Sequence, residues 1–138
     1  MRFDVLTIFP GIIKPYFSET ILKRAQDEGH IDIEVHDLRD YSTDKHASVD
    51  DSPYGGGPGM VMQVGPIYRA VKDLRTADRR PPTKVVLLSA KGEQFNQKKA
   101  REYSELEHVI LICGRYEGVD QRVHDRIADE VISVGPYV

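Results

Sequence analysis

Residues 84–112, KVVLLSAKGEQFNQKKAREYSELEHVILI, decide the fold class of this chain. They contain two continuous apolar runs, 84–88 and 109–112, separated by a polar stretch, 96–106, that has the length of a surface helix. Apolar runs without alternation are typical of strands buried on both faces of a parallel sheet, and parallel strands need a crossover that is usually a helix. We therefore predict an α/β fold with a mainly parallel sheet and flanking helices.

Further elements on both sides of this unit fit the same architecture. Pro15 predicts a kink or restart in the first helix, and Gly29 is expected to end it. Asp120 is expected to cap the last helix. The expected strands cover residues 3–8, 31–36 and 130–134, the expected helices cover 12–27, 66–74 and 120–127, and residues 76–82 are expected to form a polar connection.

Residues 38–60 have no hydrophobic periodicity and are predicted to form a long loop. A structureless loop longer than about 15 residues is usually functional or disordered. Its most unusual part is YGGGPGM at 54–60, whose glycines let the backbone approach a ligand closely. The motif is neither a Walker A loop nor a dinucleotide fingerprint. From the residues alone, a flexible surface loop remains the alternative.

Several polar residues outside that motif are weaker candidates. Asp50 and Asp51 either bind a metal or a base edge, or cap a turn. His46 is the one histidine that we single out, with plain surface placement as its alternative. The five histidines lack metal-ligand spacing, so no metal site is predicted. Cys113 is expected to be a small buried hydrophobe rather than a nucleophile.

Length and composition exclude several classes of protein. A chain of 138 residues, 40% hydrophobic and 30% charged, corresponds to about one globular domain. No apolar run approaches the roughly 20 residues of a membrane span, so no membrane partner is expected. The N-terminus lacks a secretory signal and the single cysteine fits a reducing compartment, which predicts a cytoplasmic protein.

Charge is distributed unevenly along the chain. The net charge of −3 argues against non-specific coating of nucleic acid. Residues 69–101, however, contain ten Lys or Arg against three Asp or Glu. This segment is either a localised phosphate-binding patch or an ordinary solvated surface.

Three glycine-containing segments directly follow expected strands: SAKG at 89–92, CGRYEG at 113–118 and SVGPY at 133–137. Ligands of open parallel sheets bind beyond the carboxyl ends of the strands, so we predict one site built from three loops. In CGRYEG, Glu117 would hold a positive charge and Tyr116 would stack on a ring. An ordinary strand–helix connection, with Gly118 as the turn, is an equally open interpretation.

Several motifs together carry a family resemblance. RD at 39–40, VDD at 49–51, PYGGGPGM at 53–60, LS at 88–89, Gly92, CGRYEG at 113–118 and SVG at 133–135 occur in one order and spacing. Over essentially the whole chain they resemble the bacterial tRNA (guanine-N1)-methyltransferases of the knotted SPOUT class. The resemblance implies a homodimer that binds S-adenosylmethionine in a trefoil knot and methylates N1 of the guanosine just 3′ of the tRNA anticodon.

The resemblance also implies roles for individual residues. Arg115 and Glu117 match the catalytic positions and would help to orient the reacting groups. The positions that face the target guanosine or the tRNA correspond to His46, Asp50, Pro58 and Gly59. Magnesium assists the family, but the sequence assigns it no site. The methyl-donor positions correspond to Leu87, Leu88, Ser89, Gly92, Gly114, Tyr116, Glu117, Gly118, Val134, Gly135 and Tyr137.

Some features depart from the family pattern. Ala90 and Lys91 replace a common Pro-Gln pair, and Pro136 stands where an acid is common. By the resemblance, residues 1–138 are a truncated N-terminal S-adenosylmethionine-binding domain. The segment that closes the knot, the aspartate that acts as general base and a C-terminal helical tRNA-binding domain are all expected beyond residue 138. We therefore expect an incomplete knot, weak donor binding and no methyl transfer by this chain alone.

Two rival functions belong to other classes. A non-catalytic RNA-binding or dimerisation module on the same scaffold would use the basic segment 69–101, but it would not need the retained CGRYEG loop. A nucleotide-binding enzyme would place phosphates in the loop 55–59, but the Lys-Ser/Thr of such loops is absent.

Overall fold

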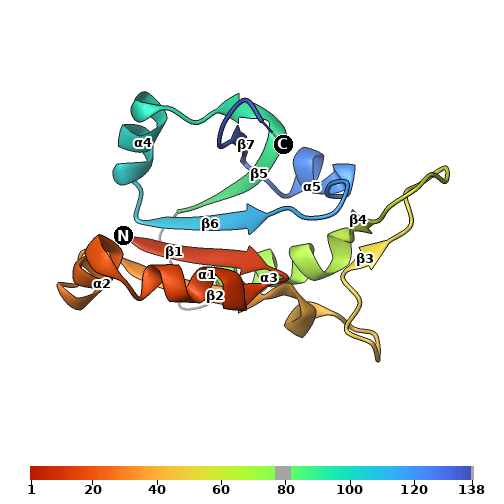
Figure 1. The fold of residues 1–138 in the computed structure, drawn as a ribbon, viewed down its shortest axis with the longest axis horizontal. Helices are drawn as coiled ribbons and strands as arrows, with labels where there is room; N and C mark the ends of the chain where they lie inside the picture. The colour runs from red at the N-terminus through yellow and green to blue at the C-terminus, as the bar shows by residue number, and fades with distance from the viewer. Residues whose placement is uncertain (77–81, 138) are drawn as a thin grey trace.

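The structure, a computed structural model, describes residues 1–76 and 82–137. Its centre is a five-stranded sheet of strand order β2-β1-β6-β5-β7, in which all neighbouring strands are parallel. The predicted α/β fold with a mainly parallel sheet is confirmed. A short antiparallel pair, β3 and β4, projects from the edge toward which β1 and β6 point (Figure 1). The strands are β1 (Arg2–Thr7), β2 (Asp32–Asp37), β3 (Asp50–Asp51), β4 (Val61–Met62), β5 (Thr83–Gln94), β6 (His108–Cys113) and β7 (Glu130–Ser133).

Helices cover both faces of the sheet, and the sheet separates the hydrophobic core into two clusters. Val85 and Leu87 point into the larger cluster, with Ile67 and Leu74 of α3 and Val123 of α5. Side chains alternate along a strand, so the intervening residue of β5 packs into the smaller cluster beside α4. Full burial of one such side chain stabilises the fold by roughly 2 kcal/mol. The helices are α1 (Pro10–Phe17), α2 (Thr20–Asp27), the 3-10 helix η1 (Leu38–Tyr41), α3 (Val64–Thr76), α4 (Gln97–Ser104) and α5 (Gln121–Arg126).

The first predicted helix is two helices, and Pro15 is not where it breaks. Pro15 lies inside α1, and the chain turns at Ser18 instead. The Ser18 backbone N–H donates to the Pro15 carbonyl and its hydroxyl donates to the Lys14 carbonyl, which ends the helix. Thr20 then begins α2 with a positive φ of 48°.

The predicted structureless loop at 38–60 contains short elements. Asp37 caps η1 by accepting a hydrogen bond from the Arg39 backbone N–H, and the fully buried Leu38 anchors it in the core. Further along, β3 pairs with β4, and Gln63 donates its side-chain amide to the Asp50 carbonyl. Contacts between residues far apart in the sequence therefore order a segment that has no local periodicity.

The predicted loop at 89–92 is also wrong, because β5 continues through it to Gln94. The edge strand β7 pairs with both halves of β5, and the register shifts between Leu88 and Glu93. Gly92 makes this possible. A Cβ atom at this position would lie 2.5 Å from the backbone of Val131 and Ile132. The predicted polar connection at 76–82 lies largely outside the described residues.

One buried polar network has no counterpart in the sequence-based predictions. Asp4 of β1 is fully buried and accepts hydrogen bonds from His36 at 2.7 Å, His108 at 2.6 Å and both ends of the Arg2 guanidinium. Burial alone would raise the pKa of Asp4, but these hydrogen bonds lower it well below its usual range. The network ties β1, β2 and β6 together. None of the described helices is long and apolar enough to cross a membrane.

Candidate functional site

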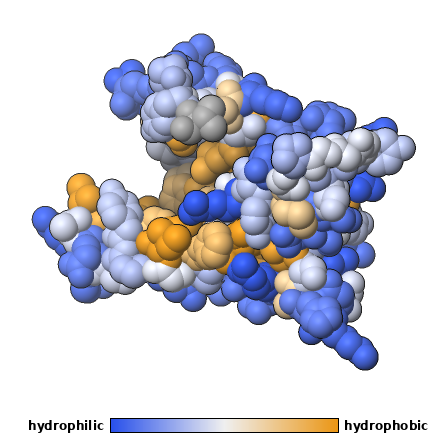
Figure 2. Space-filling view, turned by 45° about the vertical axis from the view of Figure 1, so that its right-hand side comes forward, coloured by the Kyte–Doolittle hydropathy of each residue, from blue (hydrophilic) through white to orange (hydrophobic). Residues whose placement is uncertain are grey.

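The carboxyl ends of β6 and β7 meet the bulge that follows Leu88 in β5, and this edge of the sheet is called the carboxyl edge below. Leu88 pairs with Cys113 on one side and with Ile132 on the other. Parallel pairing therefore brings Leu87, Leu88, Gly114 and Val134 to the same place. Leu87 has no exposed surface, whereas Val134 is largely exposed. Figure 2 brings this side of the molecule forward and shows a hollow with hydrophobic residues at its floor.

A pocket of about 350 Å³ lies between the bulged part of β5 and the segment after β7. Gly92 and Gly135 line it; the backbone of β7 leaves no room for a side chain at Gly92, and the Tyr137 ring lies against Gly135. The Tyr137 ring covers Gly135 so closely that a Cβ atom there would lie 2.2 Å from it. The Ser133 hydroxyl donates to the Gly135 carbonyl and fixes the turn. These predicted donor residues lie together, but glycine at both positions has a structural reason without any ligand.

The CGRYEG loop is joined directly to the end of PYGGGPGM. The Glu117 carboxylate accepts a hydrogen bond from the Met60 backbone N–H at 2.8 Å, and the Glu117 N–H donates to the Met60 carbonyl at 3.1 Å. The Met62 N–H also donates a hydrogen bond to the Gly118 carbonyl at 3.0 Å. Gly59 is needed here, since its φ is +88° and a Cβ atom would lie 2.1 Å from the Glu117 carboxyl carbon. Two motifs that are 57 residues apart thus form one structural unit.

The two predicted catalytic side chains do not point at each other. Glu117 faces Met60, whereas the Arg115 guanidinium lies over the ring of Phe9, 5.3 Å from its centroid. Arg39 lies over the same ring at 5.5 Å. Tyr116 between them has a positive φ of 60° and is 44% exposed, so its ring is free to meet a ligand. The sequence-based predictions missed Phe9 altogether.

The residues predicted to face the guanosine are distributed along the β3–β4 arm. Asp50 is half-buried at the start of β3, and Pro58 and Gly59 are exposed in the glycine-rich loop. His46 is exposed in a turn organised by Asp44, whose carboxylate accepts hydrogen bonds from the backbone N–H groups of His46 and Ser48. These hydrogen bonds, from Ser48 above all, lower the pKa of Asp44. The structure brings Gly59 to the donor side through Glu117, and His46 shares no hydrogen bond with that pair among the described residues.

Among the described residues, neither the Cys113 thiol nor the group that resembles a metal site has the surroundings of a reactive centre. Burial raises the pKa of the Cys113 thiol, which disfavours the nucleophilic thiolate. Within residues 1–76 and 82–137, the one group arranged like metal ligands is Asp4, Glu34 and His36. The Arg2 guanidinium hydrogen-bonds to both acids of this group and compensates part of its charge. The group lies within β1 and β2 rather than in the loops that follow the strands.

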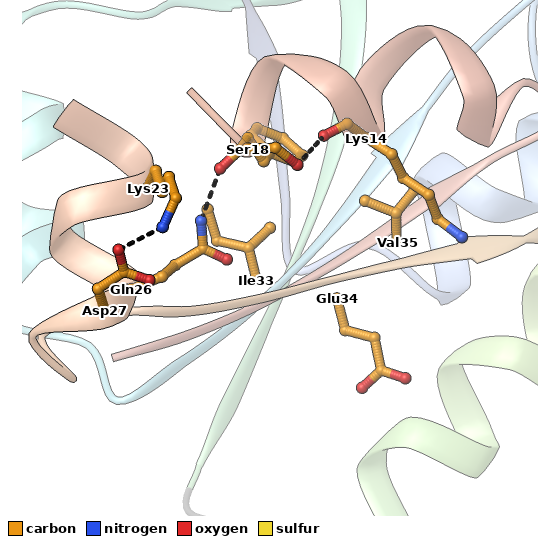
Figure 3. A pocket seen from close by; sticks show the side chains of 9 residues that line it. Lys14, Ser18, Lys23, Gln26, Asp27, Ile33, Glu34 and Val35 are labelled. Atoms are coloured by element: carbon orange, nitrogen blue, oxygen red, sulfur yellow. Dashed lines mark hydrogen bonds and ion pairs between the residues drawn. The ribbon is translucent and has the colours of Figure 1, made fainter. Parts of the chain in front are cut away.

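Two other pockets are lined by none of the predicted donor residues. The pocket in Figure 3 lies where α1 and α2 meet β2, and its polar groups hydrogen-bond to one another, as in the Lys23–Asp27 ion pair. A second pocket, of about 820 Å³, lies between the β3–β4 arm and the start of α5, lined by residues that include Tyr54, Gln63 and Arg122. The second pocket borders the arm that carries the predicted guanosine side.

Ion pairs compensate part of the positive charge of the basic segment 69–101. Arg75 pairs with Asp129 at 2.8 Å, and Lys84 pairs with Glu130 at 3.1 Å. Lys99 pairs with Glu93 and Glu130. Arg79 and Arg80 lie outside the described residues. Three of the eight described Lys and Arg residues of the segment are therefore paired with acids, and both interpretations of the segment stay open.

The parallel sheet with its loop-built carboxyl edge is that of an α/β methyltransferase domain of the SPOUT class. A profile of the tRNA (guanine-1)-methyltransferase TrmD family matches residues 1–138, and the chain belongs to this family. It is 52% identical over 138 residues to a tRNA (guanine-N(1)-)-methyltransferase of Chloroflexus aggregans and 54% identical to one of Dictyoglomus turgidum. These matches cover the whole chain but only 54% of each relative, so the chain spans about half the length of the curated relatives it matches.

A solved structure is similar over the entire chain. The crystal structure of the tRNA (m1G37) methyltransferase from Aquifex aeolicus superimposes with a TM-score of 0.89 at 43% sequence identity. The match covers 100% of this chain and 61% of that one.

Proposed function

We propose that the protein represented by this chain transfers a methyl group from S-adenosylmethionine to N1 of the guanosine just 3′ of the anticodon in tRNA. The observation that carries the proposal is the pair of hydrogen bonds between Glu117 and Met60. They connect the CGRYEG loop, on the proposed donor side, to PYGGGPGM, on the proposed guanosine side. Methyl transfer requires donor and acceptor to be held in line at short distance, and a fixed connection between the two loops supports that geometry.

The residues at the carboxyl edge fit the methyl donor. The pocket between β5 and the segment after β7 is about 350 Å³, within the range of small-molecule sites. The donor supplies a methyl group on a positively charged sulfur atom. Glu117 would supply a carboxylate that attracts this positive charge, and the exposed Tyr116 and Tyr137 rings would offer surfaces for stacking. The partly buried Leu88 would offer its backbone to the polar edge of the adenine, and the fully buried Leu87 would support it from below.

The guanosine side needs a proton acceptor, because N1 of guanine is a good nucleophile only after its proton leaves. The Glu117 carboxylate already accepts the Met60 N–H, so we assign it an orienting role rather than proton removal. Arg115, fixed over Phe9, would stabilise negative charge near the reacting groups. His46, Asp50, Pro58 and Gly59 would contact the guanosine or the tRNA. We place the general base beyond residue 138.

The assembly and location of the protein are part of the same proposal. We propose a cytoplasmic homodimer that acts on tRNA. Magnesium is given no step, because both acids of the described group Asp4, Glu34 and His36 are hydrogen-bonded to Arg2.

The test uses a version of the protein extended to the length of its relatives. It is given labelled S-adenosylmethionine and two tRNA transcripts that differ only by guanosine or adenosine 3′ of the anticodon. We expect 1-methylguanosine in the digest of the first transcript and no label in the second. Glu117→Gln should lower the rate strongly, whereas Glu105→Gln, at an exposed site after α4, should not.

Other results would redirect the proposal. Methylation of the adenosine transcript, or of another guanine atom, would contradict it. Methyl transfer by residues 1–138 alone would contradict the placement of the general base. Binding of tRNA without any binding of the donor would favour the non-catalytic RNA-binding module.

A further inference from the structure

Two arginines share one aromatic ring at the carboxyl edge. The guanidinium carbons of Arg39 and Arg115 lie 5.5 Å and 5.3 Å from the centroid of Phe9. The two guanidinium groups are therefore at most about 11 Å apart, a spacing that one or two consecutive phosphates of a single strand can bridge. Phe9 is 41% exposed, so this cluster faces solvent.

Strand order explains how the three residues meet. Arg39 follows β2, Phe9 follows β1 and Arg115 follows β6, and these strands are consecutive neighbours in the sheet. Each residue thus stands just beyond the carboxyl end of its own strand. The cluster therefore extends the carboxyl edge to β1 and β2, and Arg115 is part of the CGRYEG loop of the proposed donor site.

The two guanidinium groups are positioned in advance of any ligand. Arg39 donates a hydrogen bond from its guanidinium to the Ile8 carbonyl, whereas the Arg115 guanidinium is held by its contact with the Phe9 ring. Stacking on an aromatic face holds the planar guanidinium with donors pointing outward, which reduces the entropy lost on binding. Asp37, 3.7 Å from Arg39, is the nearest acid paired with the cluster and compensates only part of its charge.

We propose that Arg39, Phe9 and Arg115 form a binding site for RNA backbone phosphate, which fixes the strand that carries the target nucleotide. This inference rests on the proposed function. Arginine presents donors in a fork that matches two phosphate oxygens, and phosphate contacts set the register of a nucleic acid on a protein. The methyl donor is a poorer occupant, because its sulfonium carries positive charge and would be repelled by two guanidinium groups.

The experiment measures binding of the 138-residue chain to a hairpin RNA with the sequence of a tRNA anticodon arm, by fluorescence anisotropy over a range of salt concentrations. Arg39→Ala removes one guanidinium, and Arg39→Lys keeps the charge but loses the fork. Phe9→Leu removes the shared ring and leaves both charges. Arg101→Ala, at an exposed position of α4, is the charge-matched control. Circular dichroism of each variant shows whether the fold is retained.

We expect Arg39→Ala to weaken RNA binding roughly tenfold near 0.1 M salt, as loss of one charge-assisted contact does. The slope of log K against log salt should fall by about 0.7 for one lost single-strand phosphate. Phe9→Leu and Arg39→Lys should each show part of the loss, and Arg101→Ala almost none. A neutral methylphosphonate at the contacted position of the RNA should abolish the effect of Arg39→Ala, since the two changes remove the same contact.

Equal losses in Arg39→Ala and Arg101→Ala would overturn the proposal in favour of diffuse charge. Failure of the wild-type chain to bind the RNA would also overturn the proposal. The same holds if the effects of Arg39→Ala and of a methylphosphonate are additive at every position of the RNA. Weaker S-adenosylmethionine binding by Arg39→Ala with unchanged RNA binding would assign the cluster to the donor carboxylate instead. Failure of the proposed function would appear in a separate experiment, as absence of methyl transfer by the extended wild-type protein. That experiment does not use these variants.

Discussion

Gly92 offers the sharpest test of how β7 is held against the sheet. In Gly92→Ala, the new methyl group would lie 2.5 Å from the Ile132 nitrogen and from the carbonyl carbon and oxygen of Val131. Carbon atoms at optimal contact are about 3.5–4.0 Å apart, so β5 and β7 must separate by about 1 Å. The contacted atoms are backbone atoms of a paired strand, which cannot rotate away as a side chain would.

The magnitude follows from the cost of overpacking, typically about 1–3 kcal/mol. Because β7 also loses hydrogen-bond geometry on both sides of the bulge, we expect Gly92→Ala to lower the free energy of unfolding by about 2–3 kcal/mol. Urea unfolding followed by far-UV circular dichroism measures this value. The matched control is Gly11→Ala, where a Cβ atom meets nothing within 4 Å and alanine favours helix α1. It should leave stability unchanged or raise it by up to about 1 kcal/mol.

An unfolding midpoint of Gly92→Ala equal to that of the wild type would refute the reasoning. It would mean that β7 is not packed on the Gly92 backbone in solution. A stable Gly92→Ala variant of the extended protein that fails to bind S-adenosylmethionine would show that this glycine serves the ligand rather than the sheet.

Three further predictions concern charge and local geometry. Burial alone would raise the pKa of Glu130, but hydrogen bonds from Lys99, Tyr103 and Lys84 outweigh it and lower the pKa from 4.5 to about 2. The ionised Glu130 therefore stabilises the fold above pH 4.5, and this stabilisation is lost as the pH falls toward 2. Urea unfolding at a series of pH values should show a shallower acid loss in Glu130→Gln, and an unchanged pH profile would contradict this. Gly59→Ala should lower the free energy of unfolding by about 1–2 kcal/mol because of the positive φ, and it should displace the Glu117 carboxylate. We therefore expect slower methyl transfer by the extended protein at saturating donor. An unchanged rate would argue that the connection between the two loops does not matter for methyl transfer. Cys113 should react with iodoacetamide far more slowly at pH 8 than it does in urea-unfolded chain, and equal rates would show that the thiol is not buried.

The fold class could be predicted because it depends on local pattern. The apolar runs of β5 and β6 and the polar helix between them are visible within 29 residues of sequence. The cap of α5 is equally local, since Asp120 accepts the Arg122 N–H two residues away. The order β2-β1-β6-β5-β7 could not be obtained in this way, because it depends on crossovers rather than on any one segment.

The errors have the same origin. The sequence SAKG is typical of a loop, and only the pairing of β7 with both halves of β5 keeps it extended. Pro15 is a helix breaker by propensity, yet a helix of eight residues accommodates it and ends at Ser18. In both cases contacts formed by the folded chain outweigh a local preference.

The candidate site was predicted by motif but not by geometry. CGRYEG and PYGGGPGM were both recognised, whereas the Glu117–Met60 hydrogen bonds that join them depend on contacts across 57 residues. The pairing of Arg115 with Phe9 follows from the adjacency of β1 and β6, which no periodicity reveals. An aromatic residue directly before the Pro-Gly that begins α1 was the available signal for Phe9.

The most direct test of the central claim is calorimetric titration with S-adenosylmethionine and with its demethylated product, on the 138-residue chain and on the version extended to the length of its relatives. We expect clear binding of both ligands by the extended version and weak binding by the shorter chain. Absence of binding by both would contradict the donor site at the carboxyl edge, and with it the proposed methyl transfer.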